Sequence, residues 1–317
     1  MNMNILITGG AGFIGSSLCN HLSIDNHITI IDDLSMGKLE NIDINDNVTF
    51  INGSVTDKIL MQRVIKDVEF EYIFHLAAIA SVADSVERPI ETHQVNFESV
   101  LNLLELVRKF NPKLKRLIFA SSAAVYGDEP TLPKNEESVI RPLTPYAIDK
   151  FAAERYVLAY NNLYNIPTSA VRFFNVYGPN QNPNSPYSGV ISIITNQFAK
   201  KKSGKEAKFK VFGDGEQSRD FVYIADVIAA LVLIMEHNNA KGKVFNVGTG
   251  KFISINELLK TFEKLTSYSI PIEYEIEREG DIKNSFADIT KLKSLDYTPL
   301  FSIETGLKEY LEIKKII

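Results

Sequence analysis

Apolar residues follow two different spacings along the first half of the chain. Runs that are apolar at most positions predict strands of a parallel sheet whose two faces are both covered. These runs lie at residues 4–9, 27–32, 48–53, 72–77 and 116–122. The stretches between them place apolar residues three and four positions apart, as in a helix with one buried face. They lie at residues 13–22, 57–66 and 91–110. Strand–helix alternation of this kind predicts a doubly wound parallel sheet.

The pattern changes after the next apolar run, residues 169–179. A loop rich in Asn, Pro and Ser follows at 180–189, and residues 208–227 mix short strand patterns with turns. A helical pattern at 225–236 and a strand pattern at 243–249 then predict a return to the main sheet. The final segment has the pattern of a smaller α/β region.

We therefore expect two lobes, with more than one crossing of the chain between them. The sheet domain is expected to comprise residues 1–174 plus about 222–250. The smaller α/β lobe is expected to comprise about 175–221 plus 251–317.

Composition narrows the class of protein. Apolar residues make up 45% of the 317 positions, enough for a sizeable core and too many for a disordered chain. A formal net charge of −5 argues against nucleic-acid binding, which favours basic domains. The single cysteine, Cys19, excludes an intrachain disulfide and fits a reducing compartment. No apolar run is long enough to span a bilayer. We expect a soluble cytoplasmic protein that binds neither nucleic acid nor membrane.

The segment ITGGAGFIG joins the first predicted strand to the first predicted helix. It places Gly9, Gly12 and Gly15 three residues apart, which permits a tight turn and lets backbone amides approach a pyrophosphate at the helix N-terminus. Asp32 ends the second strand about twenty residues later, where an acid can bind an adenosine ribose. For the glycines alone, a tight turn without a ligand is the alternative. Together with Asp32 they favour a dinucleotide site.

Asp32 also indicates which dinucleotide would bind. A carboxylate at this position repels the 2′-phosphate of NADP, and Asp33 beside it adds to that repulsion. Lys38 carries a charge that would favour NADP instead. The two acids predict NAD.

The segment TPYAIDK places Tyr146 and Lys150 four residues apart on a predicted helix, 145–160. Residues at this spacing share one helix face. The alternative is an ordinary surface pair on an amphipathic helix. A lysine charge about 5 Å from the phenol, at an effective dielectric constant of about 20, would lower the phenol pKa by about two units. That change would move the pKa toward neutral pH, where a general base works best.

The segment FASSAAVYG places Ser121 and Ser122 at the carboxyl end of a predicted central strand. Open α/β sheets bind their ligands at this edge. A serine pair after a strand is, by itself, more often a helix cap or a turn. Combined with Tyr146 and Lys150, it predicts that Ser122 passes a proton or a hydrogen bond between a substrate hydroxyl and the phenol.

Further segments extend this pattern along nearly the whole chain: IDDLS, HLAAIASVADSVERP, RFFNVYGP, GDGEQSRDFVYIADV, NVGTG and REGD. With the motifs above, they make the chain resemble the extended short-chain dehydrogenase/reductase family and, within it, the UDP-sugar 4-epimerases. The resemblance implies a Rossmann-like domain that binds NAD and a smaller lobe that binds a UDP-sugar. It also implies a homodimer formed through the helices near 90–110 and 145–163.

The resemblance gives roles to the residues at matching positions. The catalytic set would be Ser122, Tyr146 and Lys150. The NAD contacts would be Gly9, Gly12, Phe13, Ile14, Gly15, Asp32, Asp33, Ser54, Val55, Leu76, Ala77, Ala78, Asn96, Tyr146 and Lys150. Besides Ser122 and Tyr146, the substrate contacts would be Asn175 and Arg219 at the diphosphate, with Val190, Phe212, Arg278 and Ser285. The arginines suit this role because a guanidinium binds phosphate in a bidentate way.

Ser54 departs from the family pattern, which often has an aspartate facing the adenine at this position. We expect an altered adenine contact, with NAD binding retained.

The residues after Ser122 bear on the reaction. Dehydratase and decarboxylase relatives carry an acid there, whereas this chain has Ala123 and Ala124. The resemblance then implies an NAD-dependent 4-epimerase that works through a 4-keto sugar, with transient hydride transfer to bound NAD. The expected substrates are UDP-GlcNAc/UDP-GalNAc and also UDP-Glc/UDP-Gal.

Ser285 underlies the acetamido-sugar prediction. Epimerases restricted to unmodified hexoses carry a bulky aromatic at this position, and a small side chain leaves room for a 2-acetamido group. The alternative is that Ser285 is merely a tolerated small residue in an enzyme for non-acetylated sugars. A UDP-uronic acid 4-epimerase would need a cation near the sugar C6, and a non-catalytic NAD-binding regulator would not need the catalytic set.

The five histidines are scattered without metal-ligand spacing, so the sequence predicts no metal site. His75, at a strand end, is expected to be a packing residue or to lie beside the cofactor.

Overall fold

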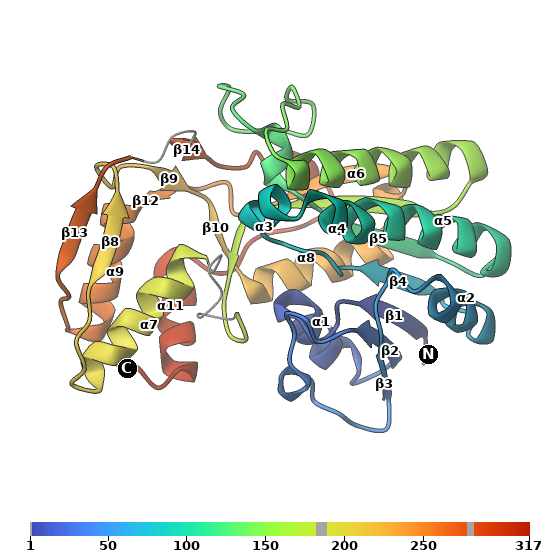
Figure 1. Cartoon of the computed structure of the whole chain (residues 1–317), viewed down its shortest axis with the longest axis horizontal. Coiled ribbons are helices and arrows are strands. Elements are labelled where there is room, and N and C mark those ends of the chain that lie inside the picture. The colour runs from blue at the N-terminus through green and yellow to red at the C-terminus, as the bar shows by residue number, and fades with distance from the viewer. Residues whose placement is uncertain (1, 182–188, 278–281) are drawn as a thin grey trace.

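The computed structural model describes residues 2–181, 189–277 and 282–317. Across these residues the central sheet has seven strands in the order β11-β6-β5-β4-β1-β2-β3, and every neighbouring pair is parallel (Figure 1). The strands are β1 (Asn4–Thr8), β2 (His27–Asp32), β3 (Val48–Asn52), β4 (Tyr72–His75), β5 (Arg116–Ser122), β6 (Thr168–Phe173) and β11 (Lys243–Val247). The predicted doubly wound parallel sheet is confirmed.

Helices cover both faces of this sheet (Figure 1). One face carries α2 (Lys58–Asp67), α5 (Ser99–Phe110) and α6 (Pro145–Tyr164), and the other carries α1 (Phe13–Leu22) and α8 (Ile224–Glu236). Leu6 of β1 belongs to the buried cluster that contains Leu103 of α5. Its neighbour Ile7 belongs to the cluster that contains Leu18 of α1 and Leu231 of α8. Side chains of a strand alternate between the two faces of a sheet. A sheet with helices on both faces therefore needs apolar residues at successive strand positions.

The strand order reverses at β1, which lies between β2 and β4. Thr8 of β1 is in register with His75 of β4, so the two strands end side by side. The chain leaves these ends through Gly9 and Leu76. Open α/β sheets bind ligands in the crevice at such a reversal.

The apolar run at 169–179 forms two strands instead of one. β6 ends at Phe173, and β7 (Asn175–Tyr177) pairs with β10 (Phe221–Tyr223) outside the main sheet. The backbone amide of Phe174 still donates to the Val247 carbonyl at 3.0 Å, whereas that of Asn175 donates to the Asp220 carbonyl at 3.1 Å. Apolar side chains continue through the break between β6 and β7, so the hydrophobic pattern alone did not reveal that break. The predicted return of the chain to the main sheet is confirmed, because β11 pairs with β6.

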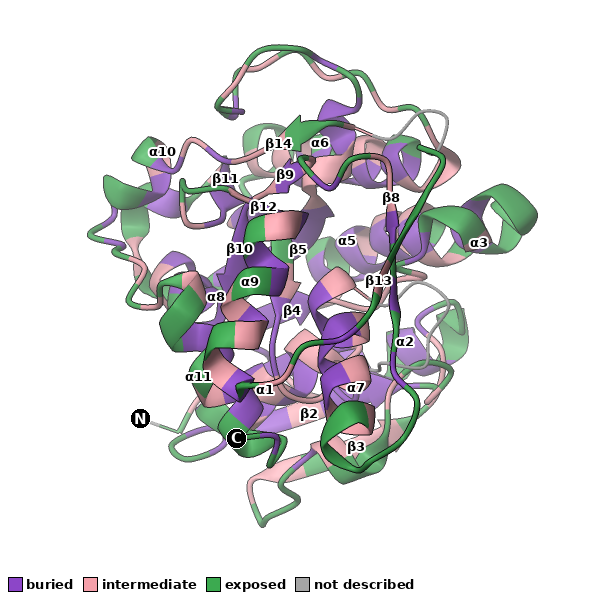
Figure 2. Cartoon of the chain, turned by 90° about the vertical axis from the view of Figure 1, so that its left-hand side faces the viewer, coloured by how far each residue is buried: buried purple, intermediate pink, exposed green. Residues whose placement is uncertain are grey.

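The second lobe combines short strands with helices (left in Figure 1, facing the viewer in Figure 2). Its strands are β8 (Phe209–Phe212) with β13 (Ile272–Glu275), and β9 (Ser218–Arg219) with β12 (Ile253–Ser254) and β14 (Asn284–Ser285). Its helices are α7 (Val190–Lys202), α9 (Ile255–Thr266) and α11 (Ile303–Ile313). Phe198 of α7 stacks on Phe262 of α9 with ring centroids 5.3 Å apart. Ser254 and Glu257 form a capping box that starts α9.

Shorter helical segments complete the fold. They are η1 (Leu39–Asn41), α3 (Val82–Glu87), α4 (Pro89–His93), η2 (Gln94–Glu98), η3 (Ala123–Tyr126), η4 (Asn238–Ala240) and α10 (Thr290–Lys293). Within the described ranges, no helix combines the length and the apolar character that crossing a membrane would require.

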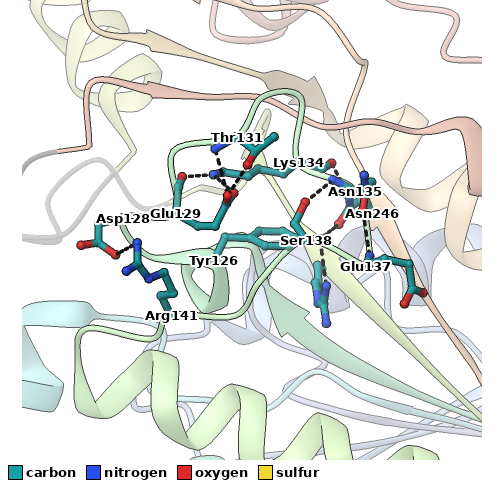
Figure 3. Close-up of polar contacts among 11 residues, drawn as sticks. Tyr126, Asp128, Glu129, Thr131, Lys134, Asn135, Glu137, Ser138, Arg141 and Asn246 are labelled. Atoms are coloured by element: carbon teal, nitrogen blue, oxygen red, sulfur yellow. Dashed lines mark hydrogen bonds and ion pairs between the residues drawn. The ribbon is translucent and has the colours of Figure 1, made fainter.

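The segment 128–144, between η3 and α6, lies against the second lobe. The Lys134 amide donates to the Phe286 carbonyl at 2.9 Å, and the Asp288 amide donates to the Lys134 carbonyl at 2.7 Å. Figure 3 shows the Lys134 side chain turned toward Glu129, with Nζ 2.6 Å from Oε2 in a buried ion pair. The sequence did not predict this connection between the lobes.

Candidate active site

Gly9, Gly12 and Gly15 form the turn from β1 into α1. Gly9 has a φ of +71°, a conformation that favours glycine, and a Cβ there would lie 2.7 Å from the Ala77 nitrogen. A Cβ on Gly15 would lie 2.2 Å from the Gly9 carbonyl oxygen. Gly12 is the N-cap of α1, and no side chain caps that helix end. The first amides of α1 therefore remain available to an anionic ligand.

Asp32 ends β2 beside this turn, with both carboxylate oxygens engaged. The Ala11 amide donates to Oδ2 at 2.9 Å, and the Leu34 amide donates to Oδ1 at 2.8 Å. Burial raises the pKa of Asp32, and these two amide hydrogen bonds oppose that shift. A carboxylate has about four acceptor positions, so Asp32 can fix the turn and still accept a ribose hydroxyl. Asp33 is exposed and accepts from the amide of Ser35 at 3.0 Å.

Leu76, Ala77 and Ala78 follow β4 and are partly buried beside the glycine turn. Asn96 is buried, and its amide group bonds Ile79 twice: Oδ1 accepts from the Ile79 nitrogen at 2.9 Å and Nδ2 donates to the Ile79 oxygen at 3.0 Å. In this structure Asn96 thus holds the backbone of the segment that carries Leu76, Ala77 and Ala78.

The other predicted NAD contacts lie on neighbouring loops and on α1. The Ser54 hydroxyl lies 2.9 Å from Thr56 Oγ1, so it is already engaged within its own turn. Val55 is buried, and Phe13 and Ile14 at the start of α1 are partly buried against the core.

Tyr146 and Lys150 lie in the first turns of α6, whose start is well defined. Thr144 is the N-cap, and its hydroxyl accepts from the Ala147 amide at 3.3 Å. Pro145 occupies the first helical position, where a missing N–H has little cost. The predicted helix at 145–160 is confirmed and extends to Tyr164.

The three predicted catalytic residues meet at the carboxyl end of β5. Ser122 ends that strand, and its side chain hydrogen-bonds Tyr146. The same hydroxyl accepts from the Ala124 amide at 3.1 Å, so Ser122 also caps η3. Lys150 is buried, and its Nζ lies 6.0 Å from the centroid of the Tyr146 ring. Nζ donates to the Ala120 carbonyl at 2.8 Å, which fixes the lysine against β5.

Burial dominates the electrostatics of this pair. It raises the pKa of Tyr146, and the hydrogen bond with Ser122 opposes that shift. The expected lowering of the phenol pKa by Lys150 is therefore wrong in its net direction. Burial also lowers the pKa of Lys150 to about 7, with the Asp149 charge acting in the opposite sense. Both groups favour their neutral forms because each is removed from water.

His75 connects the glycine turn with Lys150. Its Nδ1 lies 2.9 Å from Thr8 Oγ1, one residue before Gly9, and its ring stacks on Phe119 with centroids 6.2 Å apart. Lys150 Nζ lies 5.0 Å from the centroid of the same Phe119 ring. Burial, assisted by the Lys150 charge, lowers the pKa of His75 to about 3. His75 is a neutral packing residue between the two parts of the site.

Asn175, Arg219 and Ser285 lie on strands that neighbour one another in the second lobe. Arg219 of β9 and Ser285 of β14 are paired in register. The Asp220 amide donates to the Ser285 carbonyl, and the Asn175 amide donates to the Asp220 carbonyl, both at 3.1 Å. Arg219 Nη1 donates to the Lys283 carbonyl at 3.1 Å. The fold thus brings together three predicted substrate residues that are far apart in the sequence.

The remaining predicted substrate contacts are less closely connected. Phe212 ends β8 and lines a small cavity in the second lobe, together with Gly213, Asp214, Gln217, Glu277, Ile282 and Lys283. Val190 begins α7 and packs, partly buried, against the core. Arg278 lies outside the described residues.

Sequence reasoning missed a buried ion pair beside the predicted catalytic set. Glu154 of α6 and Arg172 of β6 are both buried, and Arg172 Nη2 lies 2.6 Å from Glu154 Oε1. Two signals were present: an arginine inside the apolar run 169–179, and a glutamate eight residues after Tyr146 on the same helix.

These features fit an NAD molecule. Cβ atoms on Gly9 and Gly15 would fill the turn at the N-terminus of α1, Asp32 ends β2 beside it, and Lys150 lies across His75 from it. Among the residues that the structure describes, no group of three or more His, Cys, Asp or Glu side chains is arranged to hold a metal ion.

A doubly wound sheet with this turn and a Ser–Tyr–Lys set defines the class of a dinucleotide-dependent enzyme. Residues 5–248 match the model of the NAD dependent epimerase/dehydratase family. A curated relative, the UDP-glucose 4-epimerase of Mycolicibacterium smegmatis, is 34% identical over 316 residues, which are 98% of each chain. The chain belongs to this family, as the motifs indicated, and its cofactor is NAD.

Two solved structures match the whole fold. A UDP-N-acetylglucosamine 4-epimerase from Methanobrevibacter ruminantium M1, in complex with UDP-N-acetylmuramic acid, has a TM-score of 0.91 and 37% identity, with 99% of each chain covered. A UDP-glucose 4-epimerase from Thermotoga maritima, with UDP-glucose, has a TM-score of 0.91 and 38% identity, with the same coverage.

Proposed function

We propose that this chain is an NAD-dependent UDP-sugar 4-epimerase that interconverts UDP-GlcNAc with UDP-GalNAc and UDP-Glc with UDP-Gal. The observation that carries the proposal is the meeting of Ser122, Tyr146 and Lys150 at the end of β5, beside the glycine turn. The two matching epimerase structures support it, since one is a UDP-N-acetylglucosamine 4-epimerase and the other is a UDP-glucose 4-epimerase.

In the proposed reaction Tyr146 removes the proton of the sugar 4-hydroxyl while C4 would give up its hydride, and Tyr146 returns the proton to the same oxygen when the hydride would return to the opposite face of C4. Ser122 hydrogen-bonds the phenol and can relay that proton. Bound NAD supplies a reversible two-electron acceptor for the sugar carbon. Lys150, held by the Ala120 carbonyl, orients the phenol and contributes positive charge while it is protonated. The 4-keto sugar turns over between the two half-reactions, so C4 is inverted without net oxidation.

The diphosphate must stay bound while the sugar turns. We assign this role to Asn175 and Arg219, which lie close together through the Asp220 backbone. A guanidinium that binds two phosphate oxygens resists rotation of the nucleotide. The chain would then divide its work between a NAD-binding domain, 1–174 plus about 222–250, and a UDP-sugar lobe, about 175–221 plus 251–317.

Ala123 and Ala124 support epimerisation over elimination or decarboxylation. They follow Ser122 in η3, so no carboxylate stands directly behind the catalytic hydroxyl. Without a second acid, the set can remove and return a proton at C4.

Nuclear magnetic resonance of the sugar products tests the proposed function. The purified protein, with no NAD added, is expected to convert UDP-Glc to UDP-Gal and UDP-GlcNAc to UDP-GalNAc. Conversion of UDP-glucuronate alone would indicate a uronic acid epimerase. Sugar-nucleotide binding without any conversion would indicate a regulator, and dinucleotide consumed in step with product would contradict epimerisation.

In this proposal, the range of UDP-sugars that the enzyme accepts depends on Ser285. Ser285 lies on β14 and is paired in register with Arg219 of β9, which supports a gate near the sugar, that is, a side chain whose size decides which sugars fit. Ser285→Tyr is expected to lower kcat/KM for UDP-GlcNAc at least about 100-fold and to change that for UDP-Glc less than about threefold, because a clash with one substrate group affects only the substrate that carries it.

Ser285→Ala is the matched control and is expected to keep both activities, because it adds no atoms. Equal losses with the two sugars in Ser285→Tyr would refute the gate.

We also propose that the chain forms a homodimer through α4, α5 and α6. Ile90 and Leu163 are 75% and 70% exposed, on α4 and α6, which contact each other. Exposed apolar patches on helices often mark such interfaces. The Ile90→Glu/Leu163→Glu variant is expected to show the monomer mass in light scattering, whereas Ile59→Glu on α2 is expected to keep the dimer. A monomeric wild type would refute this proposal.

A further inference from the structure

Helix α6 carries three ionisable side chains on one face. Tyr146, Lys150 and Glu154 are separated by four residues each, so they lie one above the other along the helix. The first two belong to the proposed catalytic set. Glu154 is fully buried, and the proposed reaction gives it no role.

Glu154 joins α6 to the two strands behind the catalytic serine. Its Oε2 accepts from Ser121 Oγ at 2.7 Å, and Ser121 directly precedes Ser122 on β5. The same oxygen accepts from Arg172 Nε at 2.9 Å, and Oε1 accepts from Arg172 Nη2 at 2.6 Å. Ser121 and Arg172 are themselves paired in register between β5 and β6. One carboxylate therefore fixes the helix of Tyr146 against the strand of Ser122.

The contacts continue from Arg172 toward the second lobe. Arg172 Nη1 donates to the Tyr126 hydroxyl at 2.9 Å, and that hydroxyl donates to Asn246 Oδ1 at 2.6 Å. Asn246 Nδ2 donates to the carbonyls of Lys134 at 2.8 Å and Asp288 at 3.3 Å. Figure 3 shows Tyr126 and Asn246 at this junction with the 128–144 segment. Asp288 lies three residues after Ser285.

We propose that the Glu154–Arg172 pair positions Tyr146 and Ser122 for proton transfer, a role that rests on the proposed epimerase function. Through Tyr126 and Asn246, the pair also ties the catalytic end of α6 to the segment that follows Ser285. Glu154 and Arg172 touch neither substrate nor cofactor in this proposal, and they act through the residues that they hold.

Stability alone does not account for such a pair. A buried ion pair is often no more stable than an apolar pair of similar volume, because both charges are removed from water. What the pair supplies is fixed geometry: a planar fork on a carboxylate, with Ser121 as a third partner. Displacement of a catalytic group by about 1 Å can reduce a rate by about 100-fold.

Glu154→Gln tests the role, because it keeps the size of the side chain and removes the charge. We expect kcat per folded molecule to fall about 10- to 100-fold, with KM and the Kd for UDP unchanged within about twofold. We also expect the Tyr146 phenol to titrate at higher pH, because it loses well-placed contact with Ser122. The titration is followed as the ultraviolet difference between each protein and its Tyr146→Phe counterpart. Lys150 faces the phenol, with Nζ 6.0 Å from the centroid of the Tyr146 ring, and Lys150 in turn interacts electrostatically with His75 and Asp149.

A second variant addresses folding. Glu154→Gln leaves the Arg172 charge unpaired and lowers the melting temperature. Glu154→Leu/Arg172→Met removes both charges and is expected to melt closer to the wild type while keeping the low kcat. Asp226→Asn is the control: its buried carboxylate accepts the amides of Leu300 at 2.8 Å and Phe301 at 3.1 Å, away from α6. It is expected to lower the melting temperature and to leave kcat per folded molecule unchanged.

Two results would overturn the positioning role. One is a wild-type kcat and an unshifted Tyr146 titration in Glu154→Gln. The other is an equal loss of kcat in Asp226→Asn, which would indicate general destabilisation. If the wild type epimerises no UDP-sugar, the proposed function fails instead. The phenol titration still decides the positioning role in that case, because it requires no turnover.

Discussion

Tyr146→Phe is expected to lower kcat for both sugar pairs about 10²- to 10⁴-fold, the usual contribution of a general acid–base group. The variant lacks only the hydroxyl that hydrogen-bonds Ser122. KM and the NAD content of the purified protein are expected to stay near their wild-type values, because the ring still fills its place beside Lys150. Steady-state kinetics and absorbance of the released cofactor measure these quantities.

The wild-type pH profile adds a second test of Tyr146. A base must lose its proton to act, and burial raises the pKa of this phenol, so kcat is expected to rise with pH across the neutral range. The rise is expected to disappear in Tyr146→Phe. Tyr164→Phe, an exposed position at the end of the same helix, is the control and is expected to behave like the wild type. A Tyr146→Phe variant that epimerises at the wild-type rate would remove the basis of the proposed mechanism.

Gly15→Ala is expected to abolish retention of NAD through purification and to weaken its binding about 10- to 100-fold. The added Cβ would lie 2.2 Å from the Gly9 carbonyl oxygen and 2.8 Å from the Gly10 Cα, and backbone atoms cannot move aside as a flexible side chain can. Overpacking of this kind typically costs about 1–3 kcal/mol. Here the displaced backbone is the turn that would cradle the pyrophosphate.

Calorimetric titration with NAD, together with the melting temperature at saturating NAD, measures the effect of Gly15→Ala. Ser17→Ala, two residues later in α1, removes an oxygen and adds nothing, so it is expected to bind NAD normally. Equal NAD affinity in Gly15→Ala and the wild type would show that the turn does not hold the dinucleotide.

The buried polar network explains how a site built from distant segments keeps its geometry. The network comprises five residues from five different elements, and each of its hydrogen bonds joins two of them: Ser121 of β5, Glu154 of α6, Arg172 of β6, Tyr126 of η3 and Asn246 of β11. Buried polar groups that satisfy one another specify a single arrangement, because any other arrangement leaves a group unpaired. The network thereby links α6, which carries the proposed catalytic residues Tyr146 and Lys150, to the lobe that we assign to the UDP-sugar.

The tyrosine–lysine and glycine motifs were accessible from the sequence because their spacing is local. Tyr146 and Lys150 share a helix face through a four-residue interval, and Gly9, Gly12 and Gly15 form one continuous turn. Asn96 was different. Its assignment as a cofactor contact came from resemblance, and the structure shows its amide bonded to Ile79 in both directions. Such bonds depend on two segments that meet only in the fold.

The sign of the Tyr146 pKa shift illustrates the same limit. The charge of Lys150 follows from its identity, so the sequence predicted a lowered pKa. The net shift is upward, because removal of the phenol from water dominates and the hydrogen bond with Ser122 opposes it only in part. Burial of the lysine also lowers its own pKa to about 7, which weakens the effect it was expected to have. Neither burial can be read from a four-residue spacing.

The amino-acid sequence by itself determined the parallel sheet, the glycine turn, the start of α6 and the family, because these follow from periodicity and from short intervals along the chain. Only the tertiary structure decided the break between β6 and β7, the attachment of the 128–144 segment to the second lobe, and the Glu154–Arg172 pair. These features depend on which distant backbone and side-chain groups meet in a dry interior, where every polar group requires a partner.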